Sequence, residues 1–304
     1  MQGLRIGHFT NKAHGTGLSV FLFDKPAVGA YLICGSAPAS HELAPLDSDM
    51  SVPVLHALML SGGSAYGLFA AKGIMQYLTE KKIGVPVPHG VVPIVPAVCI
   101  YDLAYKEPEP PRAEDAYAAC TLASQDNTAS GCIGAGTGAT VGKIIPNATP
   151  MTSGIGRAEL SLPNGVKVIA YVVVNAVGDV RDEQNNIIAG AKLANGQYAN
   201  CVQFLLSGQG EKLLFSHSNT TLAAIFTNAK FTKSELKRIC RMAVAGLGRA
   251  IAPIFTCYDG DTIFSISIGE EKAAVMTVGT MAAEAIRLAV IDAVKEAELV
   301  KENI

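Results

Sequence analysis

The chain has 304 residues, of which 49% are hydrophobic and only 16% are charged, and its formal net charge is −2. A chain of this length can bury a core large enough to fold without disulfide cross-links. The nearly neutral charge gives no electrostatic basis for binding nucleic acid or an anionic membrane, so neither partner is expected.

The cysteines and the apolar segments indicate in which cellular compartment the protein is expected. The cysteine count is odd and no CxxC pair occurs, which argues against a disulfide framework or a zinc knuckle. The N-terminal sequence MQGLRIGHFTNKAHGTG has no apolar region typical of a secretory signal. The longest apolar stretch, 166–177, is too short to span a bilayer. We therefore expect a cytoplasmic protein.

Strands and helices are predicted from the spacing of apolar and β-branched residues. Strands are expected at 18–23, 28–33, 167–174, 222–227 and 262–268. Helices are expected at 67–79, from a Thr232–Glu235 capping box to about Ile251, and at 280–300. This mixture indicates an α+β layered domain rather than regular βαβ units.

Two stretches are predicted to be exposed loops. Residues 105–115, YKEPEPPRAED, are rich in proline and charge, and residues 195–219 mix Gly, Gln, Ser and Asn.

Two glycine-rich stretches resemble common motifs but lack residues that those motifs require. In GAGTGATVGK, 134–143, Thr137 stands where a phosphate loop needs glycine and Ile144 replaces its Ser/Thr, so close backbone approach is the better interpretation. In Ser61–Gly67, Tyr66 breaks the GxSxG pattern. That stretch is interpreted as a loop-to-helix turn whose amides can bind an anionic group.

The histidines give no sign of a metal site. They show neither an HExxH motif nor i, i+4 pairing, so no metal is expected; they lie at positions 8, 14, 41, 56, 89 and 217.

Residues 217–229, HSNTTLAAIFTNA, place Asn219 and two threonines where a turn becomes a buried strand. One interpretation is an ordinary strand start, because Asn favours turns and Thr favours extended backbone. The other is that the chain is cut before Thr220, which then becomes a catalytic N-terminus with its own α-amine as base. These residues alone leave both interpretations open.

Six stretches in fixed order carry a wider resemblance: VVPIVPA at 91–97, IYDL at 100–103, GAGTGATVGK at 134–143, VNAVGDV at 174–180, NTTL at 219–222 and DGDT at 259–262. Together they resemble the DmpA-like family of self-cleaving N-terminal-nucleophile hydrolases. That family includes L-aminopeptidase/D-esterases, β-aminopeptidases and the endo-type nylon-oligomer hydrolase. The resemblance covers nearly the whole chain.

The resemblance implies a single domain over residues 1–304, folded as a four-layer αββα sandwich and autocleaved into an α chain, 1–219, and a β chain, 220–304. It implies a peptide or small-amide substrate, no cofactor and a homotetramer of cleaved units. The implied site consists of the cleavage pair Asn219 and Thr220, with Thr220 as nucleophile, the oxyanion-hole Asn175, Tyr101 and Lys143 beside the nucleophile, and the acidic pair Asp259 and Asp261 behind it.

The sequence departs from the aminopeptidase branch, which carries a serine nucleophile and a Ser/Glu combination at the acidic pair. Thr220 with Asp259 and Asp261 is more similar to the nylon-hydrolase branch. Simpler interpretations are an exposed D-G-D turn, a solvated Lys143 and a core Tyr101. An acyltransferase related to the self-cleaving ornithine acetyltransferases and an uncleaved binding protein are the alternative functions.

Overall fold

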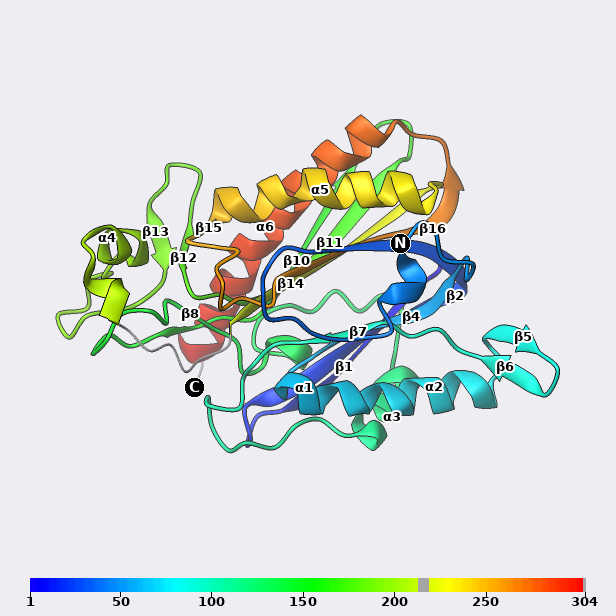
Figure 1. The fold of residues 1–304 in the computed structure, drawn as a ribbon, viewed down its shortest axis with the longest axis horizontal. Coiled ribbons are helices and arrows are strands. Elements are labelled where there is room, and N and C mark those ends of the chain that lie inside the picture. Colours follow the sequence, from blue (N-terminus) through cyan, green and yellow to red (C-terminus); the bar gives the residue numbers. More distant parts are fainter. Residues whose placement is uncertain (213–218, 303–304) are drawn as a thin grey trace.

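The computed structural model describes residues 1–212 and 219–302. The strands and helices of these residues are arranged in four layers (Figure 1). The strands are β1 (Leu4–Asn11), β2 (Thr16–Ile33), β3 (Ala39–His41), β4 (Leu55–Ser61), β5 (Val85–Val87), β6 (Gly90–Val92), β7 (Ala97–Cys99), β8 (Thr140–Val141), β9 (Met151–Thr152), β10 (Ile155–Ser161), β11 (Lys167–Asn175), β12 (Asp179–Arg181), β13 (Ile187–Ala189), β14 (Thr220–Ala229), β15 (Ile251–Ala252) and β16 (Thr262–Glu271).

The α-helices are α1 (Ser64–Gly67), α2 (Ala71–Glu80), α3 (Ala113–Thr121), α4 (Cys201–Leu206), α5 (Lys233–Ala250) and α6 (Val275–Glu302). Short 3-10 helices are η1 (Ala44–Leu46), η2 (Leu68–Ala70), η3 (Gly134–Gly136) and η4 (Gln209–Lys212). Within the described residues, no helix combines the length and apolar character needed to cross a membrane.

The long strand β2 joins the two sheet layers. Its first part, 16–22, pairs with β1 and β4, and its last part, 28–33, pairs with β16. Residues 24–26 between them are exposed, and the register shifts there. The strand order is β10-β11-β14-β16-β2-β4-β7-β3, with β1 paired to β2. One continuous sheet thus supplies both β layers.

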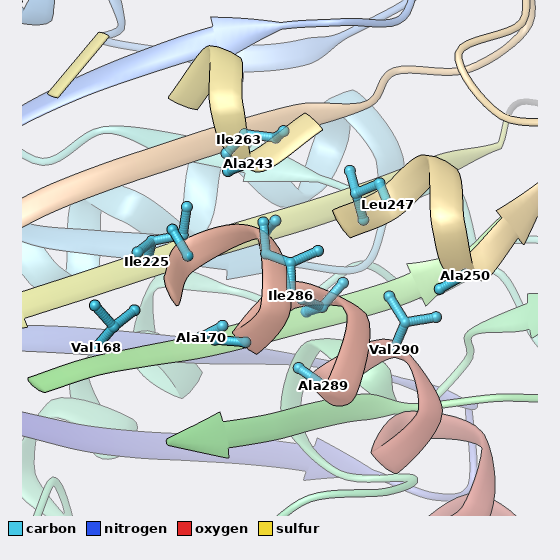
Figure 2. Close-up of a cluster of buried hydrophobic side chains, with 14 of the residues drawn as sticks. Val168, Ala170, Ile225, Ala243, Leu247, Ala250, Ile263, Ile286, Ala289 and Val290 are labelled. Carbon is cyan, nitrogen blue, oxygen red and sulfur yellow. The ribbon is translucent and has the colours of Figure 1, made fainter. Parts of the chain in front are cut away.

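Alternate side chains of β14 show how the layers pack, because successive residues of a strand point to opposite faces. Ala223 and Ile225 pack into the core beneath α5 and α6, whose side chains include Leu247 and Ile286 (Figure 2). Leu222 and Phe226 face the other way, toward Phe21 of β2, and fill the core between the two sheet layers.

The fourth layer covers the β2–β4 side of the sheet. Leu18 and Val20 pack there against Ile74 of α2 and Cys120 of α3. The order from one surface to the other is therefore helices, sheet, sheet, helices. The predicted α+β fold and its four-layer αββα arrangement are confirmed.

Local signals in the sequence located several elements correctly. Thr232 accepts from the Glu235 amide and Glu235 accepts from the Thr232 amide, so the predicted capping box opens α5. The predicted strands at 167–174, 222–227 and 262–268 are β11, β14 and β16. β14 begins at Thr220, which places the predicted loop-to-strand boundary at Asn219–Thr220.

Three predictions of local structure were wrong. The strands predicted at 18–23 and 28–33 are one strand, because exposed residues 24–26 continue in extended backbone where the sheet passes from one layer to the other. The predicted loop at 195–219 contains α4 and η4, and the one at 105–115 ends in the first turn of α3. Residues 213–218 of the first of these loops, which include His217, lie outside the described residues.

Candidate active site

The proposed site residues meet where three neighbouring strands come to the same end of the sheet. β11 ends at Asn175, which is the register partner of Thr220 at the start of β14. β14 and β16 run parallel, and Asn219 forms a bridge with Asp259 just before β16. Pairing thus brings together residues 40 to 45 positions apart in the sequence, and the central strand β14 places Thr220 between the ends of its two neighbours.

The Thr220 hydroxyl lies directly against the preceding carbonyl. Thr220 is buried, and its Oγ1 is 2.5 Å from the carbonyl oxygen of Asn219. The amide of Gly260 donates to the same oxygen at 2.8 Å. The candidate nucleophile, the carbonyl it would attack and a hydrogen-bond donor for that carbonyl are thus already in contact.

The acidic pair is buried, so the exposed-turn interpretation is excluded. Asp259 and Asp261 are 1% and 0% exposed. Asp261 accepts from the amides of Thr221 at 2.5 Å and Phe255 at 3.1 Å, and Asp259 Oδ2 accepts from the Thr256 amide at 2.7 Å. Asp261 therefore accepts from the amide of Thr221 and not from the nitrogen of Thr220.

Burial sets the protonation of this pair. It raises the pKa of Asp261, which the neighbouring Asp259 carboxylate raises further, because two negative charges close together disfavour ionisation. Burial also raises the pKa of Asp259, against the opposing effect of its bond from the Thr256 amide. The pair is therefore prepared to hold a proton at a higher pH than ordinary aspartates.

Lys143 is partly buried, and its amine is hydrogen-bonded within the site rather than free in solvent. Its Nζ donates to Asn175 twice, to Oδ1 at 2.6 Å and to the main-chain oxygen at 3.0 Å. Burial lowers the pKa of Lys143 to about 7, although the nearby carboxylates of Asp259, Asp102 and Asp261 favour its charged form. An amine of this kind can carry or give up a proton near neutral pH.

Asn175 connects the remaining predicted residues. It is fully buried, its Oδ1 also accepts from the Thr140 amide at 3.1 Å, and its Nδ2 donates to the Tyr101 carbonyl at 3.0 Å. The structure thus brings all the sequence-predicted site residues into one neighbourhood. Tyr101 takes part through its main-chain carbonyl, which accepts the hydrogen bond from Asn175 Nδ2.

Asp102 is a buried carboxylate to which the sequence reasoning assigned no role. Its Oδ2 accepts from the Thr16 hydroxyl and its Oδ1 from the Gly63 amide, both at 2.7 Å. Burial raises the pKa of Asp102, while these bonds and Lys143 lower it. The turn at Ser61–Gly67 does bind an anionic group through an amide, as expected, but that group belongs to the protein itself.

The glycines of 134–143 permit close backbone approach, as predicted. A side chain at Gly136 would place its Cβ 2.0 Å from the Ile155 nitrogen. Among the residues that the structure describes, no three His, Cys, Asp or Glu side chains are grouped to hold a metal ion.

The four layers, with Thr220 opening a central strand beside a buried polar cluster, define the class of fold. A β-aminopeptidase of Burkholderia sp. has a similar structure, with a TM-score of 0.71 and 18% identity over 96% of this chain and 84% of that one. The L-aminopeptidase D-Ala-esterase/amidase of Ochrobactrum anthropi, described as a variant of the N-terminal-nucleophile hydrolase fold, gives a TM-score of 0.74 with 14% identity and the same coverage. This chain has that fold.

Sequence comparison then identifies the family. The profile of Peptidase family S58 matches residues 1–302, and the chain belongs to this family. An uncharacterised aminopeptidase of Mycobacterium leprae is 35% identical over 298 residues, which cover 90% of this chain and 78% of that one. A 6-aminohexanoate-oligomer endohydrolase of Kocuria sp. is 31% identical over 219 residues, 71% of this chain and 61% of that one. The chain is accordingly a hydrolase of the peptidase and amidase type, and the resemblance to the DmpA-like family is confirmed.

Proposed function

We propose that this protein is a self-processing amidase or aminopeptidase. It cleaves its own Asn219–Thr220 bond and then hydrolyses peptides or small amides by acyl transfer to the freed Thr220. The observation that carries this proposal is the hydrogen bond that Thr220 Oγ1 donates to the Asn219 carbonyl oxygen at 2.5 Å, beside two buried aspartates and a partly buried lysine.

Self-cleavage begins with the hydroxyl of Thr220. Its oxygen bonds to the Asn219 carbonyl carbon, the bond from that carbon to the Thr220 nitrogen breaks, and the hydroxyl proton ends on that nitrogen. Water then opens the resulting ester, leaving a carboxylate on Asn219 and a free amine and hydroxyl on Thr220. Lys143, whose pKa is lowered to about 7 by burial, is the group proposed to carry the proton between these atoms.

The mature site combines nucleophile and base in one residue. The α-amine of an N-terminal residue has a reference pKa of about 7.7–8.0, so the neutral form of the Thr220 amine is available near neutral pH. Asn175, the strand neighbour of Thr220, is the proposed donor to the oxyanion of the substrate. One donor of this kind contributes about 3–4 kcal/mol of transition-state stabilisation in comparable sites.

The proposed substrates are amide bonds of short peptides or oligoamides. Support comes from the aminopeptidase and 6-aminohexanoate-oligomer endohydrolase relatives. Threonine with two aspartates, rather than serine with a Ser/Glu combination, favours the oligoamide side of this range.

A panel of aminoacyl p-nitroanilides and 6-aminohexanoate oligomers tests the activity. We expect release of p-nitroaniline or shorter oligomers by the wild-type protein and none by Thr220→Ala. Adding an amine acceptor separates hydrolysis from transfer: acylated acceptor as the main product would favour the acyltransferase alternative. Cleavage of neither substrate class by fully processed protein would contradict the proposal.

A further inference from the structure

The Asn219 carbonyl has a main-chain donor of its own. The Gly260 amide donates to the Asn219 oxygen at 2.8 Å, on a carbonyl that Thr220 Oγ1 contacts at 2.5 Å. Attack by a hydroxyl turns such an oxygen into an oxyanion, and a donor already in place stabilises the charge as it develops.

Asn175 is directed elsewhere in the uncut chain. Its Nδ2 donates to the Tyr101 carbonyl, and its Oδ1 accepts from Lys143 and Thr140. Its hydrogen bonds thus link it to the surrounding site and not to the Asn219 carbonyl.

The segment carrying the Gly260 amide is held rigidly on both sides. The amides of Cys34 and Gly35 donate to the main-chain carbonyl oxygen of Asp261. Those of Ser36 and Ala37 donate to the main-chain carbonyl oxygen of Asp259, and all four distances are 2.7–3.2 Å. The two aspartate carboxylates accept further amides, so the segment 259–261 is fixed through both its main chain and its side chains. A donor fixed before reaction costs no reorganisation when charge appears.

Only glycine fits at position 260. A Cβ there would lie 2.9 Å from Thr220 Oγ1 and 2.8 Å from the Ala37 oxygen. The absence of a side chain lets the amide approach the cleavage site at the same point where the nucleophile needs room.

We propose that the Gly260 main-chain amide is the oxyanion donor of self-cleavage, whereas Asn175 serves the oxyanion of the substrate. The inference rests on the self-cleavage proposed above. It gives the two reactions of one nucleophile separate donors: a main-chain group for the bond that is cut once, and a side chain for the bonds that are cut repeatedly.

Replacing Gly260 by glycolic acid tests this assignment, because an ester in place of the amide removes the N–H and keeps the shape. Cleavage is followed by the ratio of uncut to cut chain on denaturing gels. We expect it to slow about 100-fold, the loss typical of removing one oxyanion donor. The matched control carries the same replacement at Gly165, whose amide donates to Leu162 in the turn between β10 and β11.

The outcomes separate the two proposals. A wild-type chain that stays uncut would overturn self-cleavage itself. A wild type that cuts, with the Gly260 ester cutting as fast as the Gly165 ester, would overturn the role of the amide alone.

A second measurement applies whether or not the ester variant folds. Hydrogen exchange of the Gly260 amide in the uncut Thr220→Ala protein should show strong protection. Exchange at the rate of a free loop amide would also overturn the assignment.

Discussion

β14 carries a buried threonine near each end, and the two ends have opposite surroundings. At one end, Thr227 Oγ1 donates to the Lys167 carbonyl at 3.0 Å and accepts from the Ala229 amide at 3.1 Å. Ser267 likewise donates to the Ala229 carbonyl at 2.6 Å. These hydroxyls complete the hydrogen bonding of the main chain where the strand ends, which is a structural task.

At the other end, Thr220 lies among groups that are costly to bury. Asp259 and Asp261 are buried there and Lys143 is partly buried, and the loss of water contact shifts the pKa of each toward the value that favours its neutral form. Two buried threonines of one strand therefore differ in their neighbours and not in their own chemistry. Buried ionisable groups with shifted pKa values cluster at functional sites, so the contrast favours Thr220 as the reactive residue.

The largest effect is expected from Thr220 itself. Thr220→Ala removes the hydroxyl that contacts the Asn219 carbonyl, so the chain should stay uncut and amide hydrolysis should fall by at least about a thousandfold. Thr220→Ser keeps a hydroxyl and should still cut. Gel analysis and the amide assay measure both, and efficient cutting of Thr220→Ala would remove Thr220 from the mechanism.

The acidic pair should give the next largest effect. Asp259→Asn and Asp261→Asn, assayed on fully cut protein, should raise the barrier to turnover by about 2–5 kcal/mol, or roughly 30- to 5,000-fold. Asp261→Asn should be the more severe, because both oxygens of Asp261 accept amides and an NH₂ group would oppose one of them.

The matched control for the pair is Asp182→Asn. Asp182 also accepts main-chain amides, from Gln184 and Asn186, in a surface turn. It should retain wild-type turnover. Wild-type turnover by both cut variants of the acidic pair over pH 6–9 would show that the pair is not catalytic.

Lys143 should impose a pH dependence on self-cleavage. Its pKa is lowered to about 7, so the neutral amine that can take up a proton accumulates as pH rises through that value. The rate of cutting should therefore increase with pH, with a midpoint near 7. In Lys143→Arg the side chain stays charged, so cutting should be slow and flat with pH. An unchanged profile in this variant would exclude Lys143 as the proton carrier.

The smallest effect is expected at the other end of β14. Thr227→Val removes the hydrogen bond to the Lys167 carbonyl and the one from the Ala229 amide. This should lower the free energy of unfolding by about 1–2 kcal/mol. Cutting and turnover should stay at wild-type rates. Urea denaturation of cut protein and the amide assay check this, and a large loss of turnover without loss of stability would erase the contrast between the two threonines.

Much of the fold could be predicted because its signals are local. The β-branched runs of β11, β14 and β16 and the capping box of α5 depend on neighbouring residues, and the structure confirms them. The sequence predicts two strands in place of β2 because Asp24, Lys25 and Pro26 interrupt the apolar pattern. They are tolerated where the strand crosses between sheet layers with their side chains exposed, and only the tertiary arrangement reveals that.

The site could be predicted only in part. Resemblance supplied the residues, but no spacing rule relates Lys143, Asn175, Thr220 and Asp261, because strand pairing over long sequence separations brings them together. Asp102 lies within the IYDL stretch, but the resemblance implies a role there only for Tyr101. The role proposed for Gly260 depends on its main-chain amide, which leaves no chemical signature in the sequence.

The most direct test of the central claim is the mass and N-terminal sequence of purified protein under denaturing conditions. The account predicts two fragments, residues 1–219 and 220–304, with the smaller at about 9 kDa and beginning TTLAAIFTNA. A single species of 31.7 kDa that begins MQGLR and still hydrolyses amides would contradict it.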